Sequence, residues 1–134
     1  MRVGLLPLLL LLVVLLTGCG SVTLAEYQLP SSASSGTAQI LRSFASQYGF
    51  QPVSQSHSPP QMGRALGAYT EIAVRNPIVL NGFDRSGRVF VTMGEPGAKK
   101  SERFSRYEDV LRNRLRDAFG DRVQFHSRVW TSML

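Results

Sequence analysis

The sequence has a single cysteine, Cys19, and only two histidines, His57 and His126. One cysteine excludes an internal disulfide, and neither histidine has the closely spaced ligand neighbours of a metal site. There is also no Gly-x-Ser-x-Gly elbow and no glycine-rich phosphate loop. We therefore expect a protein that is not an enzyme and that has no cofactor or metal. Carboxylates that meet only in the fold leave a hydrolase as a further alternative.

Charge is missing from the start of the chain, where no charged residue occurs between Val3 and Ala25. Arg2 precedes an apolar stretch, Val3 to Leu16, and small residues follow it, as in a secretory signal. As a helix this stretch extends about 21 Å, at ~1.5 Å per residue. A bilayer core is ~30 Å thick, so cleavage is favoured over the alternative of an uncleaved membrane anchor.

The residues Leu16-Thr17-Gly18-Cys19 end this segment. They resemble the lipobox of bacterial lipoproteins, in which a peptidase cuts before a cysteine that carries a diacylglycerol on its sulfur. The resemblance covers the N-terminus only. It implies that Cys19 is the lipidation site and that acyl chains hold the protein on a membrane. In Gram-negative lipoproteins, an aspartate directly after the lipidated cysteine tends to retain the protein at the inner membrane. Gly20 occupies that position here, so the resemblance also implies the periplasmic face of the outer membrane in a Gram-negative cell.

The composition divides the chain into three parts. Residues 1–18 are the predicted signal peptide. Residues 19–36 are interpreted as the lipidated cysteine and a flexible tether, because Ser, Gly and Pro30 are frequent there. Residues 37–134 are long enough for one modest core and form a single predicted periplasmic domain.

Hydrophobic periodicity predicts an α+β fold in that domain. We expect a small two-layer sandwich, with a mostly antiparallel sheet of about four strands and two helices on one face. Gly49 is expected to end the first helix, and the residues 84–87 are expected to form a hairpin turn. The expected helices are 37–48 and 101–119, and the expected strands are 50–53 (short), 68–75, 78–83, 88–93 and 123–130.

Two helices on one side leave the second face of the sheet open to water or to a partner. Alternation along the strands predicts aromatic and basic side chains on that face, and exposed apolar patches often mark contact surfaces. The predicted partner-binding residues are Tyr69, Phe90, His126, Arg128 and Trp130.

The second predicted helix and the residues before it, 99–116, are rich in arginine and lysine. Export makes nucleic acid an unsuitable partner, whereas phospholipid or lipopolysaccharide phosphates would suit Arg103, Arg106, Arg114 and Arg128. The alternative is a solvated helix face with i,i+4 ion pairs, Glu102 with Arg106 and Glu108 with Arg112.

The sequence thus predicts a lipid-anchored envelope lipoprotein that acts as a protein-binding or assembly accessory module. Its expected partners are the membrane, through Cys19, and an envelope protein. Direct binding of an anionic envelope component is the alternative function.

Replacing the predicted lipid attachment site tests the N-terminal assignment. Cys19→Ala is expected to leave the signal uncleaved or to remove the acyl chains, because the sulfur is the acceptor. Intact-mass measurement on both proteins gives the result. Normal processing of the variant would show that the lipobox assignment is wrong.

Overall fold

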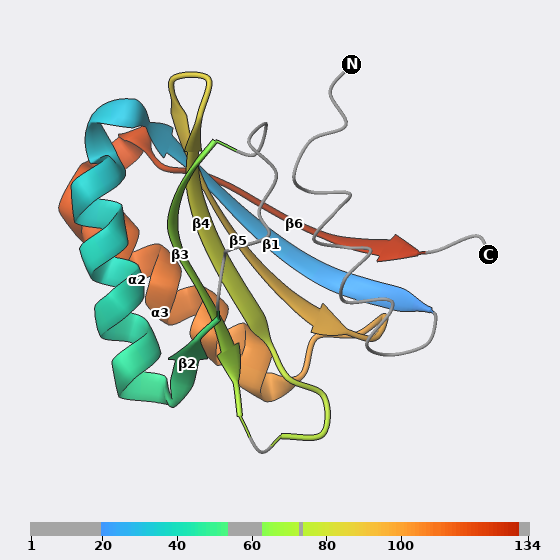
Figure 1. Cartoon of the computed structure of the whole chain (residues 1–134). Helices are drawn as coiled ribbons and strands as arrows, with labels where there is room; N and C mark the ends of the chain where they lie inside the picture. Colours follow the sequence, from blue (N-terminus) through green and yellow to red (C-terminus); the bar gives the residue numbers. More distant parts are fainter. Residues whose placement is uncertain (1–19, 54–62, 73, 132–134) are drawn as a thin grey trace.

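The structure is a computed structural model that describes residues 20–53, 63–72 and 74–131. In this part of the chain, six strands form one antiparallel sheet in the order β2-β3-β4-β5-β1-β6. Helices α2 and α3 lie side by side on one face of it (Figure 1). This confirms the α+β class, but the expected number of strands, about four, is wrong. The predicted signal peptide, Cys19 and His57 lie outside the described residues.

Along the chain, strands and α-helices alternate in groups, and two short 3-10 helices connect some of them. The bounds are β1 (Ser21–Pro30), η1 (Ser31–Ala33), α2 (Ser34–Tyr48), β2 (Phe50–Pro52), β3 (Arg64–Glu71), β4 (Val79–Arg85), β5 (Arg88–Pro96), α3 (Glu102–Phe119), η3 (Gly120–Arg122) and β6 (Gln124–Thr131).

The main correction concerns residues 19–36, which were expected to form a flexible tether. From Ser21 onward they form β1, η1 and the first turn of α2, and β1 pairs with β5 on one side and β6 on the other. Val22, Leu24, Ala25, Tyr27 and Leu29 are all buried. Buried Ala25, Tyr27 and Leu29 alternate with the less buried Glu26 and Gln28, a strand pattern that the nearby serines and glycines obscured.

Helix α2 covers β2, β3 and β4 with the face that includes Leu41, Phe44 and Ala45, all buried. It ends at Gly49, whose φ of 78° confirms the expected left-handed stop. Gly82 of β4 lies directly beneath Leu41, and a Cβ there would approach the leucine side chain to 2.4 Å. The glycine therefore allows the helix to approach the sheet closely.

Helix α3 begins after Ser101, whose hydroxyl accepts the backbone N–H of Phe104 at 3.0 Å. This N-cap contact satisfies one of the free donors at the helix start. Phe104, Tyr107, Leu111 and Leu115 follow at helical spacing and are buried against the sheet. The predicted boundaries, 101–119, agree with the observed helix.

Aromatic rings fill the space between α2, α3 and β2. Phe44, Tyr48, Phe50 and Tyr107 form a cluster with ring centroids 4.8–5.6 Å apart. Tyr27 of β1 also reaches α3, where its hydroxyl donates to the carbonyl of Glu108 at 2.8 Å. Burial, with a further effect from the Glu108 charge, raises the pKa of Tyr27 and keeps it a neutral donor.

The predicted hairpin turn joins β4 and β5 at the end of the sheet opposite to the start of β1 (Figure 1). Ser86 and Gly87 both have positive φ, 53° and 79°. Two such residues give the turn a twist that matches the twist of the strands. The hairpin assignment is therefore confirmed.

Removing β1 tests the correction. A chain that begins at Ser31 is expected to lose cooperative folding, because β6 then has no neighbour in the sheet and the apolar faces of β1 are lost. A chain that begins at Gly20 is the matched control. Thermal melts followed by circular dichroism compare the two. A sharp transition in both chains would restore the tether interpretation.

Candidate functional site

The strand register brings three of the predicted contact residues onto one face of the sheet, opposite the helices. Phe90, His126 and Arg128 lie across from Gln28, Glu26 and Leu24 of β1, which are alternate residues. Residues that are directly opposite in an antiparallel pair share a face. These three residues therefore share the face that sequence alternation assigned to them.

Tyr69 does not belong to this face, and its assignment is corrected. It pairs with Leu80 and is buried in the core cluster beneath the helices. The next residue on the same side of β3 is Glu71, which is also buried. A buried carboxylate made this side appear to be the polar one in the sequence.

Trp130 can be located only by its backbone, which pairs with Val22 at the start of β1. The position of its side chain lies outside the described part of the structure. Its role in binding therefore remains a prediction.

The centre of the face opposite the helices is closed to water, contrary to the expected open surface. Val22 and Leu24 of β1 are 0% and 1% exposed. Phe83 of β4 is also buried, and its ring stacks on that of Phe90 with centroids 5.4 Å apart. Among the described elements, no helix or strand lies over this face. Exposed side chains occur toward β6, where His126 and Arg128 lie.

The two edges of the sheet differ in length and composition. β2 has three residues and includes Pro52, and both features protect an edge from pairing with another strand. β6 has eight residues and no proline. Its side chains from His126 to Val129 are exposed. β6 is therefore the edge that is suited to accept a further strand.

The hydrogen bonding of β1 shows which residues of β6 direct their backbone outward. Gly97 donates its N–H to the carbonyl of Ser21 at 2.7 Å, so odd-numbered residues of β1 face β5. Even-numbered residues of β1 then face β6, because backbone groups alternate along an antiparallel strand. By the register, Phe125, Ser127 and Val129 direct their N–H and C=O groups away from the sheet.

A small polar network lies beside this edge. Glu26 accepts a hydrogen bond from Gln28 Nε2 at 2.7 Å, and its other oxygen is 3.7 Å from Arg128 Nη2. Arg128 is about half exposed in this pair, so its guanidinium can also reach a partner. The surface therefore offers a cation, an imidazole at His126 and an aromatic edge at Phe90.

The ion pairs of the basic helix differ from those expected. Glu108 is buried and pairs with Lys100 at 2.7 Å, whereas Arg112 pairs with Asp109 at i,i+3. Within the described residues, no ion pair forms between Glu102 and Arg106. The i,i+4 pattern was therefore misleading, because the fold provides Glu108 with a closer cation from the loop before α3.

Arg103 lies in a partly buried ionic cluster rather than on a free basic surface. Its guanidinium donates to both oxygens of Glu71, with Nε 2.9 Å from Oε2, and to the carbonyl of Asn76 at 3.1 Å. Glu95 is 4.0 Å away and accepts from the backbone and hydroxyl of Ser101. The hydrogen bonds that Arg103 donates to Glu71 raise the pKa of Arg103, so the cation is permanent.

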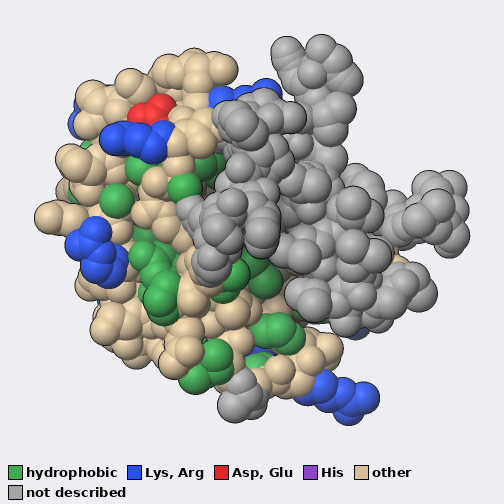
Figure 2. All heavy atoms as spheres, in the orientation of Figure 1, with side chains coloured by type: hydrophobic (Ala, Val, Ile, Leu, Met, Phe, Trp, Pro, Cys, Tyr) green, Lys and Arg blue, Asp and Glu red, His purple; other side chains and the backbone are tan. Residues whose placement is uncertain are grey.

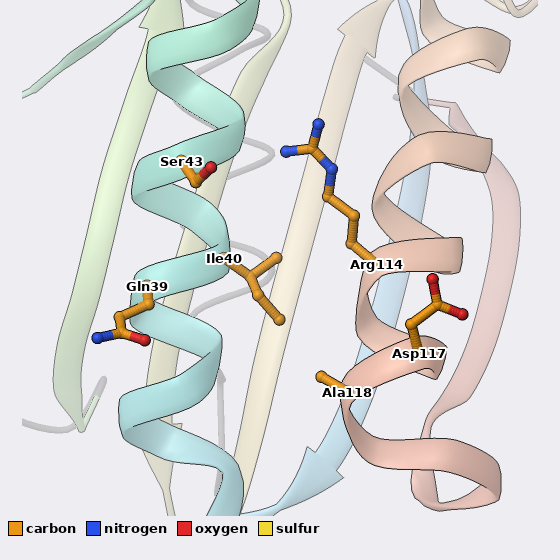
Figure 3. A pocket seen from close by; sticks show the side chains of 6 residues that line it. All are labelled: Gln39, Ile40, Ser43, Arg114, Asp117 and Ala118. Atoms are coloured by element: carbon orange, nitrogen blue, oxygen red, sulfur yellow. The ribbon is translucent and has the colours of Figure 1, made fainter.

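A shallow groove of about 510 Å³ lies between α2 and α3 on the outer side of the helices (Figure 3). Ile40 projects from α2 toward Ala118 of α3, and Arg114 extends across the gap toward α2 (Figure 3). The Arg114 guanidinium already donates to Gln47. The groove is open and holds no nucleophile paired with a base, so it offers a weak contact surface rather than a reaction site.

Comparisons with other sequences do not assign the chain to a family. Neither a protein-family model nor a curated protein matches the chain. Among the described residues, no group of three or more His, Cys, Asp and Glu could hold a metal ion. Within the same residues, no helix has the length and hydropathy needed to cross a bilayer.

The buried ionic cluster predicts a large effect from a single substitution. Arg103→Ala leaves the Glu71 carboxylate, which is 5% exposed, without its cation. The free energy of unfolding is expected to fall by about 1–3 kcal/mol. Arg112→Ala, in the exposed pair with Asp109, is the control and should cost only ~0.2–1 kcal/mol. If urea denaturation gave equal losses of unfolding free energy for the two variants, the buried cluster would stabilise the fold no more than the exposed ion pair does.

Proposed function

We propose that this protein is a lipid-anchored accessory lipoprotein of the bacterial envelope that binds a partner protein along β6. Acyl chains on Cys19 hold it on the membrane, and the partner adds an extended segment to the free edge of the sheet. The observation that carries the proposal is the difference between the two edges. β2 is short and contains proline, and β6 is long and exposed.

Strand addition suits this edge physically. Main-chain hydrogen bonds from Phe125, Ser127 and Val129 would provide affinity, because their outward groups have no partner strand among the described residues. Side chains beside the edge would provide selectivity. Arg128 and His126 on one face favour a segment with acidic residues, and Phe90 offers aromatic contact further in.

The alternative function, binding of anionic envelope components by the basic residues, has less support. Arg103 is held by Glu71, and Arg114 by Gln47. Arg106 lies over the ring of Tyr107, with its guanidinium carbon 5.6 Å from the centroid. Arginines that already have partners offer less to a phosphate than free ones, because a phosphate would have to displace those contacts.

A proline on the outer side of β6 tests the proposal. Ser127→Pro removes one outward N–H and leaves the bonds to β1 in place, so the fold should persist and partner capture should fail. Ser127→Ala retains the N–H and is the matched control. A photo-reactive side chain at position 128 of the full chain, in the bacterium that makes it, reports the partner as a crosslinked band.

The crosslink is expected in the wild-type and Ser127→Ala backgrounds and not in Ser127→Pro. A photo-reactive side chain at exposed Arg116 of α3 gives the background level. Thermal melts verify that all variants fold. Equal crosslinking with proline and alanine at position 127, or an equal yield from position 116, would refute binding along β6.

A further inference from the structure

The start of β1 determines which end of the domain lies near the predicted lipid anchor. β1 begins at Ser21, two residues after Cys19. Two residues span at most about 7 Å, whatever their conformation. The acyl chains on Cys19 would therefore hold this end of the sheet at the membrane surface, with no long linker between them.

The strand register identifies what else lies at that end. Ser21 pairs with Thr131 of β6, and Val22 pairs with Pro96 of β5. Gly97, which follows β5, donates to the carbonyl of Ser21, so the loop into α3 lies beside the start of β1. The connection from β3 to β4 lies at the same end, because Val79 of β4 pairs with Gly94 of β5 (Figure 1).

Exposed apolar side chains are concentrated at this end. The described part of the chain exposes four large hydrophobic side chains, and three of them are here. They are Ile72 and Val74 in the β3–β4 connection, at 49% and 38%, and Val129 near the end of β6, at 48%. Such a group is unfavourable in water and suits the boundary between headgroups and acyl chains.

Exposed basic residues lie at the same end. Arg75 follows Val74, Lys99 and Lys100 precede α3, and Arg106 lies in its second turn, all exposed. Glu102 is the exposed acid beside them, whereas Glu71, Glu95 and Glu108 are buried among their partners. Figure 2 shows hydrophobic and basic side chains on the lower part of the molecule, where the β3–β4 connection lies.

These side chains are held in place by contacts inside the domain. Arg103 bonds to the carbonyl of Asn76, and the Glu71 carboxylate accepts the backbone N–H of Ile78 at 2.9 Å. Both contacts fix the connection that carries Val74 and Arg75. A surface that is ordered in advance loses less entropy on binding.

We propose that this end of the domain, the membrane-facing tip, rests on a bilayer of anionic phospholipid. The tip consists of Ile72, Val74, Arg75, Lys99 and Val129. The apolar side chains enter the interface, and the cations meet lipid phosphates. Each contact is weak alone, but an anchor within about 7 Å of Ser21, at the same end of the sheet, makes the tip contact intramolecular. The proposal rests on the lipid anchor of the proposed function.

Fluorescence at a labelled cysteine tests the contact. The full chain with Val74→Cys is labelled with NBD and reconstituted into vesicles of phosphatidylcholine, with or without phosphatidylglycerol. Spin-labelled lipid in the same vesicles quenches a dye that touches the bilayer. Quenching is expected at position 74 in the anionic vesicles. Ser86→Cys, in the hairpin at the far end, should remain unquenched.

Charge reversal tests the role of the cations. In the Val74→Cys chain, the double change Arg75→Glu and Lys99→Glu should lower the ratio of membrane-bound to unbound tips by about fivefold per residue. Quenching of the dye at position 74 reports this ratio. Arg88→Glu with Arg122→Glu, in elements at the far end, carries the same net charge and is the matched control. Equal effects of the two pairs would overturn a specific role for the tip.

The outcomes separate this inference from the proposed anchor. Intact mass and vesicle flotation report acyl chains on Cys19 independently of the dye. An acylated, floating chain with an unquenched dye at position 74 would overturn the tip contact and leave the anchor in place. A chain without acyl groups whose dye is still quenched would support the tip and refute the anchor. A chain with neither property would refute both.

Discussion

The whole domain depends on the position of β1 between β5 and β6. Its odd-numbered side chains pack beneath the helices, where Tyr27 also bonds to α3, and Val22 and Leu24 are buried on the opposite face. Without this strand, β6 would have no ladder and the core would lose the row of Ala25, Tyr27 and Leu29. The same strand also connects the sheet to Cys19, so the fold and the proposed anchoring share one segment.

Sequence reasoning succeeded where a local signal decides the structure. The two helices have one apolar stripe each, Gly49 has the conformation that ends a helix, and Ser86-Gly87 form a tight turn. It failed for β1, although Ala25, Tyr27 and Leu29 alternate there with Glu26 and Gln28. Pro30, the last residue of β1, and the serines after it favoured a tether, although those serines form a 3-10 turn and the start of a helix.

Alternation along the strands placed part of the candidate site correctly and part of it wrongly. Phe90, His126 and Arg128 share a face, as alternation predicts. Tyr69 was assigned wrongly because Glu71, on its side of β3, appeared to mark the solvated side. Glu71 is buried because Arg103, 32 residues later in the chain, supplies its counter-charge. The unequal edges of the sheet depend on strand order, which periodicity in one chain does not specify.

The first strand of the described domain and the last one are neighbours, with Ser21 across from Thr131. β6 is an edge strand, so the other five strands can pair without it, but β1 has no neighbour until β5 is available. The first segment of the described domain therefore stays unpaired until residues 88–96 are present, which makes its pairing a non-local event.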